Sequence, residues 1–548
     1  MNELSRYFLD ISDGTTVTLE QNRVYHVRQD DSYALTGYYC TNTAAVNENP
    51  NGKRNAAIYL RKKHGITIDG NGAVILIHGK MTPFLFDACE DITVRNLTVD
   101  YACPTMAEFT VLSGSGSVYD IRISPDTQFR VEENRLFWTG ETGADGQPYW
   151  EFPADGPKQF VHIFDPAAEK SRWVGSDRLR FQSIEQLDER TLRVVPSSGA
   201  EDYILGQIFQ TRNIVRDQTG ALLQRCRNLL FENLRIRFMH GLGMTAQFCE
   251  NVTYRGCDLT PGEGRTITST ADFFQFSGCR GKLVIDGCHA RGAQDDFANI
   301  HGTHLRIVGA EGKNVTVRFM HKETWGIQAF ETGDAVEFIR WDTLRPYAEA
   351  VVAAWERLND TDIRLTLDRE LPEETIVGKD VLENAAWTPD VHITNCNIDT
   401  IACRGILCTT RGEVVIENNR FYHLKGPALL IEDDCNFWYE SGYTRHIVFR
   451  NNEIIGCNYD RRYPDAPVIC CSPKVMNENS EEFVHGMFTL TGNTFREACT
   501  GTHTIRLEYA AQAEISGNTF DAPYALSLYK SGVVTEKDNI FPKTEKGA

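Results

Sequence analysis

Short segments in which apolar and polar residues alternate recur along the chain. Each is followed by a turn containing Asn or Gly and then by a second short alternating segment. Alternation with a period of two is typical of β-strands. Nine copies of this unit begin at Asp91, Asn228, Asn251, Lys282, Asp390, Glu413, His446, Met487 and Ala513. Such repetition predicts a repeat architecture rather than several unrelated domains.

The spacing of the copies predicts how they pack. Successive starting points differ in residue number by 23 (251 − 228 and 413 − 390), by 31 (282 − 251) and by 33 (446 − 413). One unit is too short to bury its own apolar face, so each strand is expected to pair in parallel with its equivalent one coil away, at about 4.8 Å. Because connections between parallel strands are usually right-handed, the pattern predicts an all-β, right-handed parallel β-helix. Asn residues at its tight turns are expected to form a hydrogen-bonded ladder.

Two intervals lack the repeat and contain longer β-type segments rich in aromatic and β-branched residues, which predicts two small inserted β-domains that wall a cleft. The apolar spacing of residues 344–358 also fits a helix, so their conformation stays open. The predicted parts are an N-terminal β-helix part (1–104), an inserted β-domain (105–225), central coils (226–304), a second inserted β-domain (305–390) and C-terminal coils (391–548).

Charge and hydropathy restrict the partners of the chain. The 75 acidic residues against 56 basic ones give a formal net charge of −19, which opposes binding to nucleic acid or to an anionic membrane. No apolar run reaches the roughly 18 residues of a membrane span. A neutral or cationic substrate is therefore expected, and a homo-oligomer stays open. The chain starts without a basic segment followed by an apolar one, so a cytoplasmic location is expected unless a leader has been removed.

The sixteen cysteines are predicted to be small buried residues in a reducing compartment rather than a disulfide framework, because no CxxC pair occurs. Several of them occupy repeating strand positions, namely Cys226, Cys249, Cys279, Cys257, Cys288 and Cys396.

Candidate chemistry centres on the segment "ARGAQDDFANIHGTH", residues 290–304, which contains Asp295 and Asp296. Asp272 and Asp295 differ by 23 in residue number (295 − 272), which is one short coil, so their carboxylates are expected to stack. Stacked carboxylates repel each other, which raises at least one pKa toward a value that suits a general acid. Both adjacent aspartates can face outward only if the chain bends between them. The alternative is that these aspartates are turn residues with local hydrogen bonds.

Other polar residues are candidates for holding a ligand. Asn299 and His301 are expected to hydrogen-bond a polar ligand. In "IEDDCNFWYESG", Trp438 can stack on the apolar face of a sugar beside Glu440. A solvated acidic corner with a core tryptophan is the alternative for this segment. The histidines have no cysteine partners at metal-ligand spacing and the chain has no nucleotide-binding loop, so neither a metal ion nor a cofactor is expected.

The segment from Ala271 to His304, together with "FETGDAVEFI" from Phe330 and "FWYESG" from Phe437, resembles glycoside hydrolase family 110. The resemblance implies a parallel β-helix with inserted β-barrel domains. It also implies an inverting, exo-acting α-galactosidase that cleaves terminal α-1,3-linked galactose from oligosaccharides or glycans, so the expected partner is a galactose-terminated glycan.

Carried onto this sequence, the resemblance implies an acidic centre of Asp272, Asp295, Asp296 and Glu331. Asp295 would be the general acid, Asp272 or Glu331 would activate water, and Asp296 would orient the pair or the sugar. Two alternatives stay open: another β-helix carbohydrate enzyme such as a polygalacturonase-like hydrolase, whose NTD, GHG and RIK motifs are absent here, and a β-helix glycan-binding protein without catalytic activity.

Overall fold

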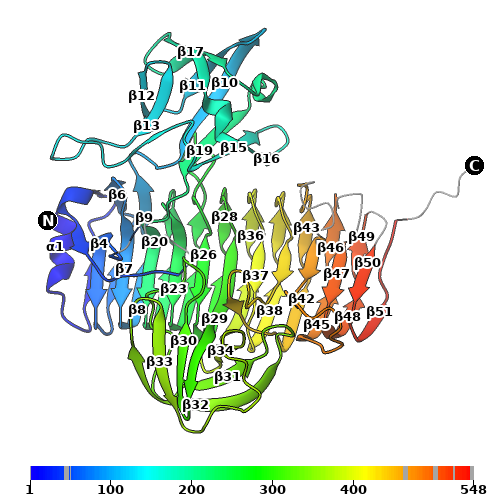
Figure 1. Ribbon diagram of the computed structural model, residues 1–548. Helices are drawn as coiled ribbons and strands as arrows, with labels where there is room; N and C mark the ends of the chain where they lie inside the picture. Colours follow the sequence, from blue (N-terminus) through cyan, green and yellow to red (C-terminus); the bar gives the residue numbers. More distant parts are fainter. Residues whose placement is uncertain are drawn as a thin grey trace, which may run out of the picture.

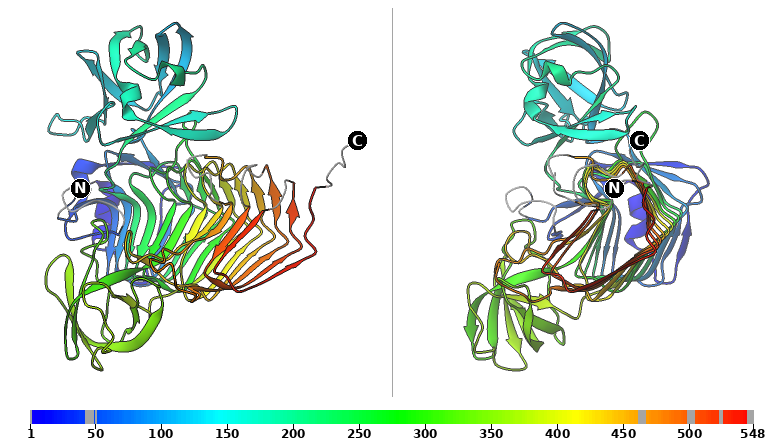
Figure 2. Two further views of the ribbon diagram at one scale, coloured as in Figure 1. Left: turned by 45° about the vertical axis from the view of Figure 1, so that its right-hand side comes forward. Right: turned by 90° about the vertical axis from the view of Figure 1, so that its right-hand side faces the viewer.

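The computed structural model describes residues 2–41, 49, 51–460, 467–497, 504–521 and 525–542. Figures 1 and 2 show a long solenoid of stacked β-coils with one compact β-rich domain on either side of it. A short helix, α1 (Glu3–Leu9), covers the N-terminal end of the solenoid, where its Leu4 and Phe8 join the buried core. No helix in the described part of the chain is long and apolar enough to cross a membrane.

Three sheets form the faces of the solenoid, and their strands pair in parallel from coil to coil. Sheet 1 contains β1 (Thr16–Thr18), β5 (Thr67–Asp69), β8 (Glu90–Arg95), β21 (Arg227–Glu232), β24 (Glu250–Arg255), β27 (Arg280–Asp286), β35 (Asp390–Thr394), β38 (Glu413–Glu417), β42 (His446–Arg450), β45 (His485–Thr491), β48 (Ala510–Ser516) and β51 (Val533–Lys537).

Sheet 2 contains β2 (Val24–Arg28), β6 (Val74–His78), β9 (Thr98–Tyr101), β22 (Arg235–Ile236), β25 (Asp258–Leu259), β28 (His289–Arg291), β36 (Asn397–Asp399), β39 (Arg420–Tyr422), β43 (Glu453–Ile455), β46 (Thr494–Arg496) and β49 (Thr519–Phe520). Sheet 3 contains β4 (Arg54–Arg61), β7 (Thr82–Asp87), β20 (Thr219–Gln224), β23 (Leu242–Gln247), β26 (Phe274–Ser277), β29 (Ala298–Glu311), β37 (Ile406–Cys408), β40 (Leu429–Ile431), β44 (Ile469–Cys471), β47 (Ile505–Glu508) and β50 (Leu526–Tyr529). The antiparallel strand β3 (Tyr33–Leu35) pairs with β4, and β41 (Glu440–Ser441) pairs with β29.

The register of sheet 1 confirms the predicted parallel β-helix and its coil lengths. Paired positions of β21 and β24, and of β35 and β38, differ by 23 in residue number (252 − 229 and 414 − 391). For β24 with β27 the difference is 31 (283 − 252), and for β38 with β42 it is 33 (447 − 414). Inward-facing Ile, Val, Leu and Phe side chains from all three sheets form one continuous core along the solenoid. The alternating pattern therefore specifies both the strands and their stacking.

An asparagine ladder runs along the turn between sheets 1 and 2, as predicted. The side-chain amide of Asn419 donates to Asn452 at 3.1 Å, Asn452 donates to Asn493 at 3.1 Å, and Asn493 donates to Asn518 at 2.9 Å. The backbone N–H of Cys396 donates to the first rung at 2.9 Å. Each buried amide is thus satisfied by the next coil, which fixes the register of the C-terminal coils.

The cysteines of the described residues are all free, and every one of them except Cys403 is buried. They serve as small apolar core residues, in agreement with their positions in the repeat.

The first inserted domain leaves the solenoid after β9 and forms its own hydrophobic core. It is built from a seven-stranded antiparallel sheet, a three-stranded sheet and two 3₁₀ turns. Its strands are β10 (Ala107–Ser115), β11 (Val118–Ile123), β12 (Gln128–Glu132), β13 (Arg135–Thr139), β14 (Glu151–Pro153), β15 (Gln159–Asp165), β16 (Lys170–Val174), β17 (Phe181–Gln186), β18 (Thr191–Pro196) and β19 (Ile208–Asn213). The domain ends before the predicted boundary at position 225, because β20 already pairs with β7 and β23 of sheet 3.

The second inserted domain begins within β29, whose C-terminal half leaves sheet 3 and joins an antiparallel barrel with a separate core. The other strands are β30 (Asn314–Arg318), β31 (Ala335–Ile339), β32 (Pro346–Arg357), β33 (Asp362–Leu367) and β34 (Val381–Asn384). The segment 344–358, whose conformation the sequence leaves open, forms β32. The alternate burial of Ala350 and Val352 shows that the period of two prevails there.

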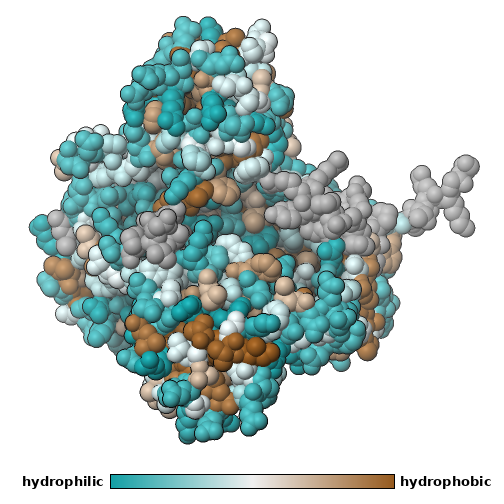
Figure 3. All heavy atoms as spheres, in the orientation of Figure 1, coloured by the Kyte–Doolittle hydropathy of each residue, from teal (hydrophilic) through white to brown (hydrophobic). Residues whose placement is uncertain are grey.

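The molecular face in Figure 3 is mainly hydrophilic, and brown apolar side chains gather over the second inserted domain. The described residues of this domain include the exposed apolar side chains Met320, Ile376 and Val377.

Candidate active site

A column of charged residues lies at the corner where the chain enters sheet 3. Paired positions of β26 and β29 differ by 24 in residue number (298 − 274), and those of β29 and β37 differ by 108 (406 − 298). Two positions before these strands, the register places Asp272, Asp296 and Arg404 on successive coils. The predicted stacking of Asp272 on Asp295 is therefore wrong by one position, because the local coil is one residue longer than expected. The Asp272 Oδ1 instead accepts a hydrogen bond from the Asp296 N–H at 3.2 Å.

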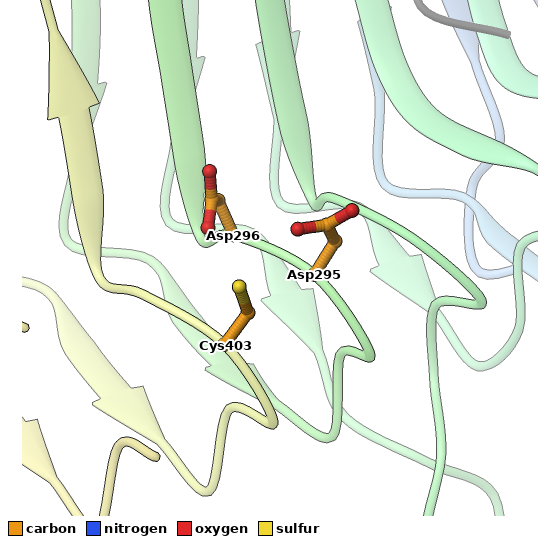
Figure 4. Close-up of side chains that lie close together, drawn as sticks. All are labelled: Asp295, Asp296 and Cys403. Atoms are coloured by element: carbon orange, nitrogen blue, oxygen red, sulfur yellow. The ribbon is translucent and has the colours of Figure 1, made fainter. Parts of the chain in front are cut away.

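Asp295 and Asp296 both face outward because the chain bends between β28 and β29. Gly292, at φ 78°, begins this bend. Figure 4 shows the two carboxyl groups on the same side of the bend, with Cys403 on the neighbouring coil. The Asp295 side chain is 24% exposed, whereas that of Asp296 is 1% exposed. Asp295 is thus the member of the pair that a bound ligand can reach.

Two arginines neutralise these carboxylates. The Arg404 guanidinium holds Asp296 with two parallel hydrogen bonds, Nε to Oδ1 at 2.8 Å and Nη2 to Oδ2 at 2.7 Å. Arg216, which follows the first inserted domain, donates from Nη2 to the Asp295 Oδ2 at 2.7 Å. Bidentate pairing fixes the plane of a carboxylate as well as its charge, so Asp296 is held rigidly.

The three aspartates have different affinities for protons. Burial and the charges of Asp295 and Asp296 hold the pKa of Asp272 well above its ordinary value. Burial, helped by the Asp295 charge, raises the pKa of Asp296 to about 6 despite Arg404. Burial also opposes ionisation of Asp295, but Arg216 and Arg404 outweigh it, and the pKa of Asp295 lies below its ordinary value. Within the cluster, Asp272 is therefore disposed to hold a proton and Asp295 to be ionised.

These aspartates form the floor of a cavity of about 880 Å³. The first inserted domain and the segment after it contribute Phe160, Arg212, Ile214 and Arg216 to the walls, and the second inserted domain contributes Lys322 and Glu323. The remaining wall comes from coils next to the floor and from the segment before β41, with Phe437 and Trp438. The two inserted domains thus border the cleft in the way the sequence predicts.

The structure brings most of the predicted ligand-binding residues to this cavity. Asn299, Trp438 and Glu440 line it. The Asn299 amide donates to the Glu440 Oε1 at 3.4 Å, and the half-exposed Trp438 ring lies 4.3 Å from the ring of His321. His301 is buried behind this wall and does not line the cavity. Its Nε2 lies 2.7 Å from the Gln275 amide nitrogen and its Nδ1 lies 2.6 Å from the Gly302 carbonyl oxygen, while the Glu440 Oε1 is 3.6 Å away.

Glu331 does not belong to the cavity, contrary to the expectation from the family resemblance. It is exposed in a turn of the second inserted domain, where its backbone N–H donates to the Asp334 Oδ2 at 2.7 Å. Asp334 also accepts hydrogen bonds from Asn384 at 2.7 Å and from the Trp387 indole at 3.2 Å. The "ETGD" segment is therefore a structural turn, and its carboxylate lies away from the acidic floor.

Sequence reasoning missed Arg216, Arg404 and Cys403. The repeat spacing could not reveal Arg404, because the second inserted domain lies between β29 and β37 in the sequence. Arg404 is therefore far along the chain from Asp296, its neighbour in space. Once the inserted domain is removed, the strand register alone places Arg404 opposite Asp296 and Cys403 opposite Asp295. No comparable signal marks Arg216, since it lies outside the repeat.

A parallel β-helix with neighbouring carboxylates on the floor of a polar, tryptophan-walled cavity has the features of a carbohydrate-active protein, and its relatives place it in the glycoside hydrolase class. Residues 314–382 match the family model described as GLAA-B beta-barrel domain II. The chain is 36% identical to alpha-1,3-galactosidase A of Akkermansia muciniphila over 87% of this chain and 76% of that protein. It is 32% identical to alpha-1,3-galactosidase A of Bacteroides fragilis, over 84% of this chain and 74% of that protein. The chain belongs to this family of α-1,3-galactosidases, glycoside hydrolase family 110.

Solved structures resemble the chain only distantly. A hyperthermoactive exopolygalacturonase from Thermotoga maritima has a TM-score of 0.35 at 12% identity, over 96% of this chain and 94% of the other. A likeness this weak carries no argument about function.

Activity is expected to be insensitive to chelators. Among the described residues, the one group of three side chains spaced to hold a metal ion is Asp295, Asp296 and Cys403. The guanidinium groups of Arg216 and Arg404 already occupy the positions where a cation would be attracted. Dialysis against EDTA should therefore leave kcat and KM unchanged. Loss of activity in EDTA with recovery on adding calcium would contradict this expectation.

Proposed function

We propose that this protein is an exo-acting, inverting α-galactosidase that hydrolyses terminal α-1,3-linked galactose from oligosaccharides or glycans. The observation that carries the proposal is the buried cluster of Asp272, Asp295 and Asp296 on the cavity floor of a chain in this family. The names of the relatives supply the linkage and the sugar.

The charge state of the cluster supports an acid–base mechanism. Inverting hydrolysis needs one protonated carboxyl to protonate the departing oxygen and one ionised carboxylate to remove a proton from water. Neighbouring carboxyls whose pKa values are displaced in opposite directions, upward for Asp272 and downward for Asp295, suit these two roles. Water adds to the anomeric carbon as the glycosidic bond breaks. The acid's proton goes to the aglycone oxygen, and the water's proton goes to the base.

The free protein favours a particular division of roles. Asp272, whose pKa is held well above its ordinary value, is the proposed acid. Asp295 is ionised by Arg216, is the most exposed of the three, and is the proposed base. This exchanges the roles that the family resemblance implies for Asp272 and Asp295. Asp296 has both oxygens bound to Arg404 and is a positioning residue that holds the corner of the coil.

The shape of the cavity supports attack on a chain end. Walls from both inserted domains and from the segment before β41 surround the acidic floor, so one terminal sugar fits against the carboxylates while the rest of the glycan extends outward. Trp438 offers an aromatic face to the apolar side of a pyranose. Asn299 and Glu440 are placed to hydrogen-bond sugar hydroxyls.

Proton NMR of fresh product tests the reaction and its stereochemistry together. Incubation with an α-1,3-linked galactose disaccharide is expected to release galactose that appears first as the β-anomer and then mutarotates, as inversion demands. Matched disaccharides with α-1,4 and α-1,6 linkages serve as controls for linkage. First appearance of α-galactose would contradict inversion, and binding without release of galactose would contradict catalysis.

A further inference from the structure

A second groove, of about 490 Å³, is lined in part by the segment of the second inserted domain that also contributes to the catalytic cavity. Within the second inserted domain, Lys322 and Glu323 face the cavity, whereas Gly326, Ile327 and Gln328 line the groove. One continuous segment, residues 322–328, therefore contributes to both hollows.

The groove is lined by aromatic rings. Trp355 of β32, half-buried, forms one wall, and Tyr39, from the segment after β3, forms another. The Tyr39 ring packs on Trp325 at 5.1 Å between ring centroids. Gly326 lies directly beneath the Tyr39 ring, since a Cβ at that position would be 2.7 Å from the ring. The ring is thus held in a fixed orientation, as an aromatic platform for a sugar requires.

Hydrogen-bond donors stand beside these rings. Arg357 is the next residue but one after Trp355 on the same strand, so both side chains project from the same face of β32. The Arg357 Nη2 donates to the carbonyl oxygens of Gly326 and Ile327, at 2.6 and 2.9 Å, which fixes the guanidinium at the groove. Within the described part of the chain, no carboxylate lies within ion-pair distance of Arg357. Burial lowers the pKa of its guanidinium.

The lining has a clear chemical bias. Of the described residues that line the groove, none is acidic, although the chain as a whole carries a net charge of −19. Arg357 and Gln328 place N–H groups beside flat aromatic faces. The N–H groups of Gln224, Arg225 and Gln247 are instead engaged within the protein, by Asp87, Gln328 and the Tyr39 carbonyl oxygen. A ligand that matches this lining has many acceptor oxygens and an apolar face, and a pyranose has both.

We propose that this groove is a second carbohydrate-binding site, which holds a neutral oligosaccharide arm of the same glycan whose terminal galactose occupies the catalytic cavity. The inference rests on the proposed function for the class of its ligand. The site acts by keeping a branched glycan near the cavity after one arm is released, so it affects the affinity for large substrates rather than the chemical step.

Kinetics of Trp355→Ala on a small and a large substrate test the proposal. An aryl α-galactoside fills only the catalytic cavity, so its kcat and KM should not change. A branched glycan with several terminal α-1,3-linked galactose arms should show a KM raised by about fivefold or more with kcat unchanged, because a stacked ring contributes roughly that much. Arg357→Gln should act in the same direction. Trp173→Ala, which removes a half-exposed tryptophan of the first inserted domain, is the matched control.

Direct binding separates this site from the catalytic one. Titration of the branched glycan into Asp295→Asn should give a lower Kd than titration into Asp295→Asn/Trp355→Ala, because the first variant can hold two arms of one glycan and the second only one. Equal effects of Trp355→Ala and Arg357→Gln on both substrates, or no effect on either, would overturn the proposal. An equal Kd of the branched glycan for the single and the double variant would do the same. If no variant hydrolyses any substrate, the proposed activity fails, while the titration still reports on the groove.

Discussion

Replacement of Asp295 by Asn is expected to lower kcat on an α-1,3-linked galactose disaccharide by a factor of about 10² to 10⁴, the usual contribution of acid–base catalysis. The amide cannot accept a proton from water. Loss of the carboxylate also leaves the Arg216 guanidinium without its ion-pair partner. Thermal unfolding measured alongside the kinetics shows whether the fold is retained. Glu331→Gln is the matched control, and it should keep wild-type activity because Glu331 lies outside the cavity.

The same variants on an aryl α-galactoside assign the roles within the cluster. A phenolate leaves readily without protonation, so loss of the acid matters less on this substrate, whereas loss of the base matters equally on both. Asp272→Asn is therefore expected to be less impaired on the aryl substrate, and Asp295→Asn equally impaired on both. The reverse pattern would make Asp295 the acid. Near wild-type activity of both Asp295→Asn and Asp296→Asn would place the site elsewhere, around Glu440.

Arg411→Met is expected to destabilise the junction between the solenoid and the second inserted domain by about 3–5 kcal/mol, the usual cost of removing one partner of a buried ion pair. Arg411 is buried, and it donates to Glu337 of β31 at 3.2 Å and to Glu383 of β34 at 2.7 Å. Its removal leaves two buried carboxylates without a cation. Urea-induced unfolding followed by tryptophan fluorescence measures the change in the free energy of unfolding.

The control for this prediction is Arg364→Met, which removes an exposed arginine that pairs with Glu356 within the same domain. Solvent screens that pair, so the expected change is about 0–1 kcal/mol. Equal stability of the two variants would show that Arg411 and its two glutamates contribute nothing to the attachment of the domain.

The alternating pattern was sufficient to predict the solenoid because the same pattern of strand, turn and strand recurs from coil to coil. A strand with a period of two that cannot bury its face alone has few ways to pack, and the spacing of copies then sets the coil length. The prediction was in error by one position at Asp272, because the register between β26 and β29 advances by 24 (298 − 274) where the shortest repeats advance by 23 (252 − 229). A shift of one position decides which of two adjacent aspartates stands above Asp272.

The charge balance of the site could not be read from the sequence. Arg404 lies 108 residues after Asp296, and Arg216 lies 79 residues before Asp295. Only folding brings the guanidinium groups to the carboxylates. Glu331 shows the opposite error. The family resemblance places Glu331 in the acidic centre, but in the structure Asp334 holds this segment in a turn. Asp334 accepts hydrogen bonds from the Glu331 N–H, from Asn384 and from Trp387.

The way the inserted domains are anchored has a consequence for how the chain assembles. Strands β8 and β21 are neighbours in sheet 1 although their paired positions differ by 137 in residue number (227 − 90), a separation that makes direct pairing slow. The first and last strands of the intervening domain pair with each other, with Ala107 opposite Thr211. Similarly, Leu305 and Leu382 are paired at the base of the second domain. Each inserted domain has its own core, so its folding brings the two ends of a long insertion close together. The coils on either side are then joined by only a few residues of unfolded chain, and the strands of the solenoid can pair one coil after another.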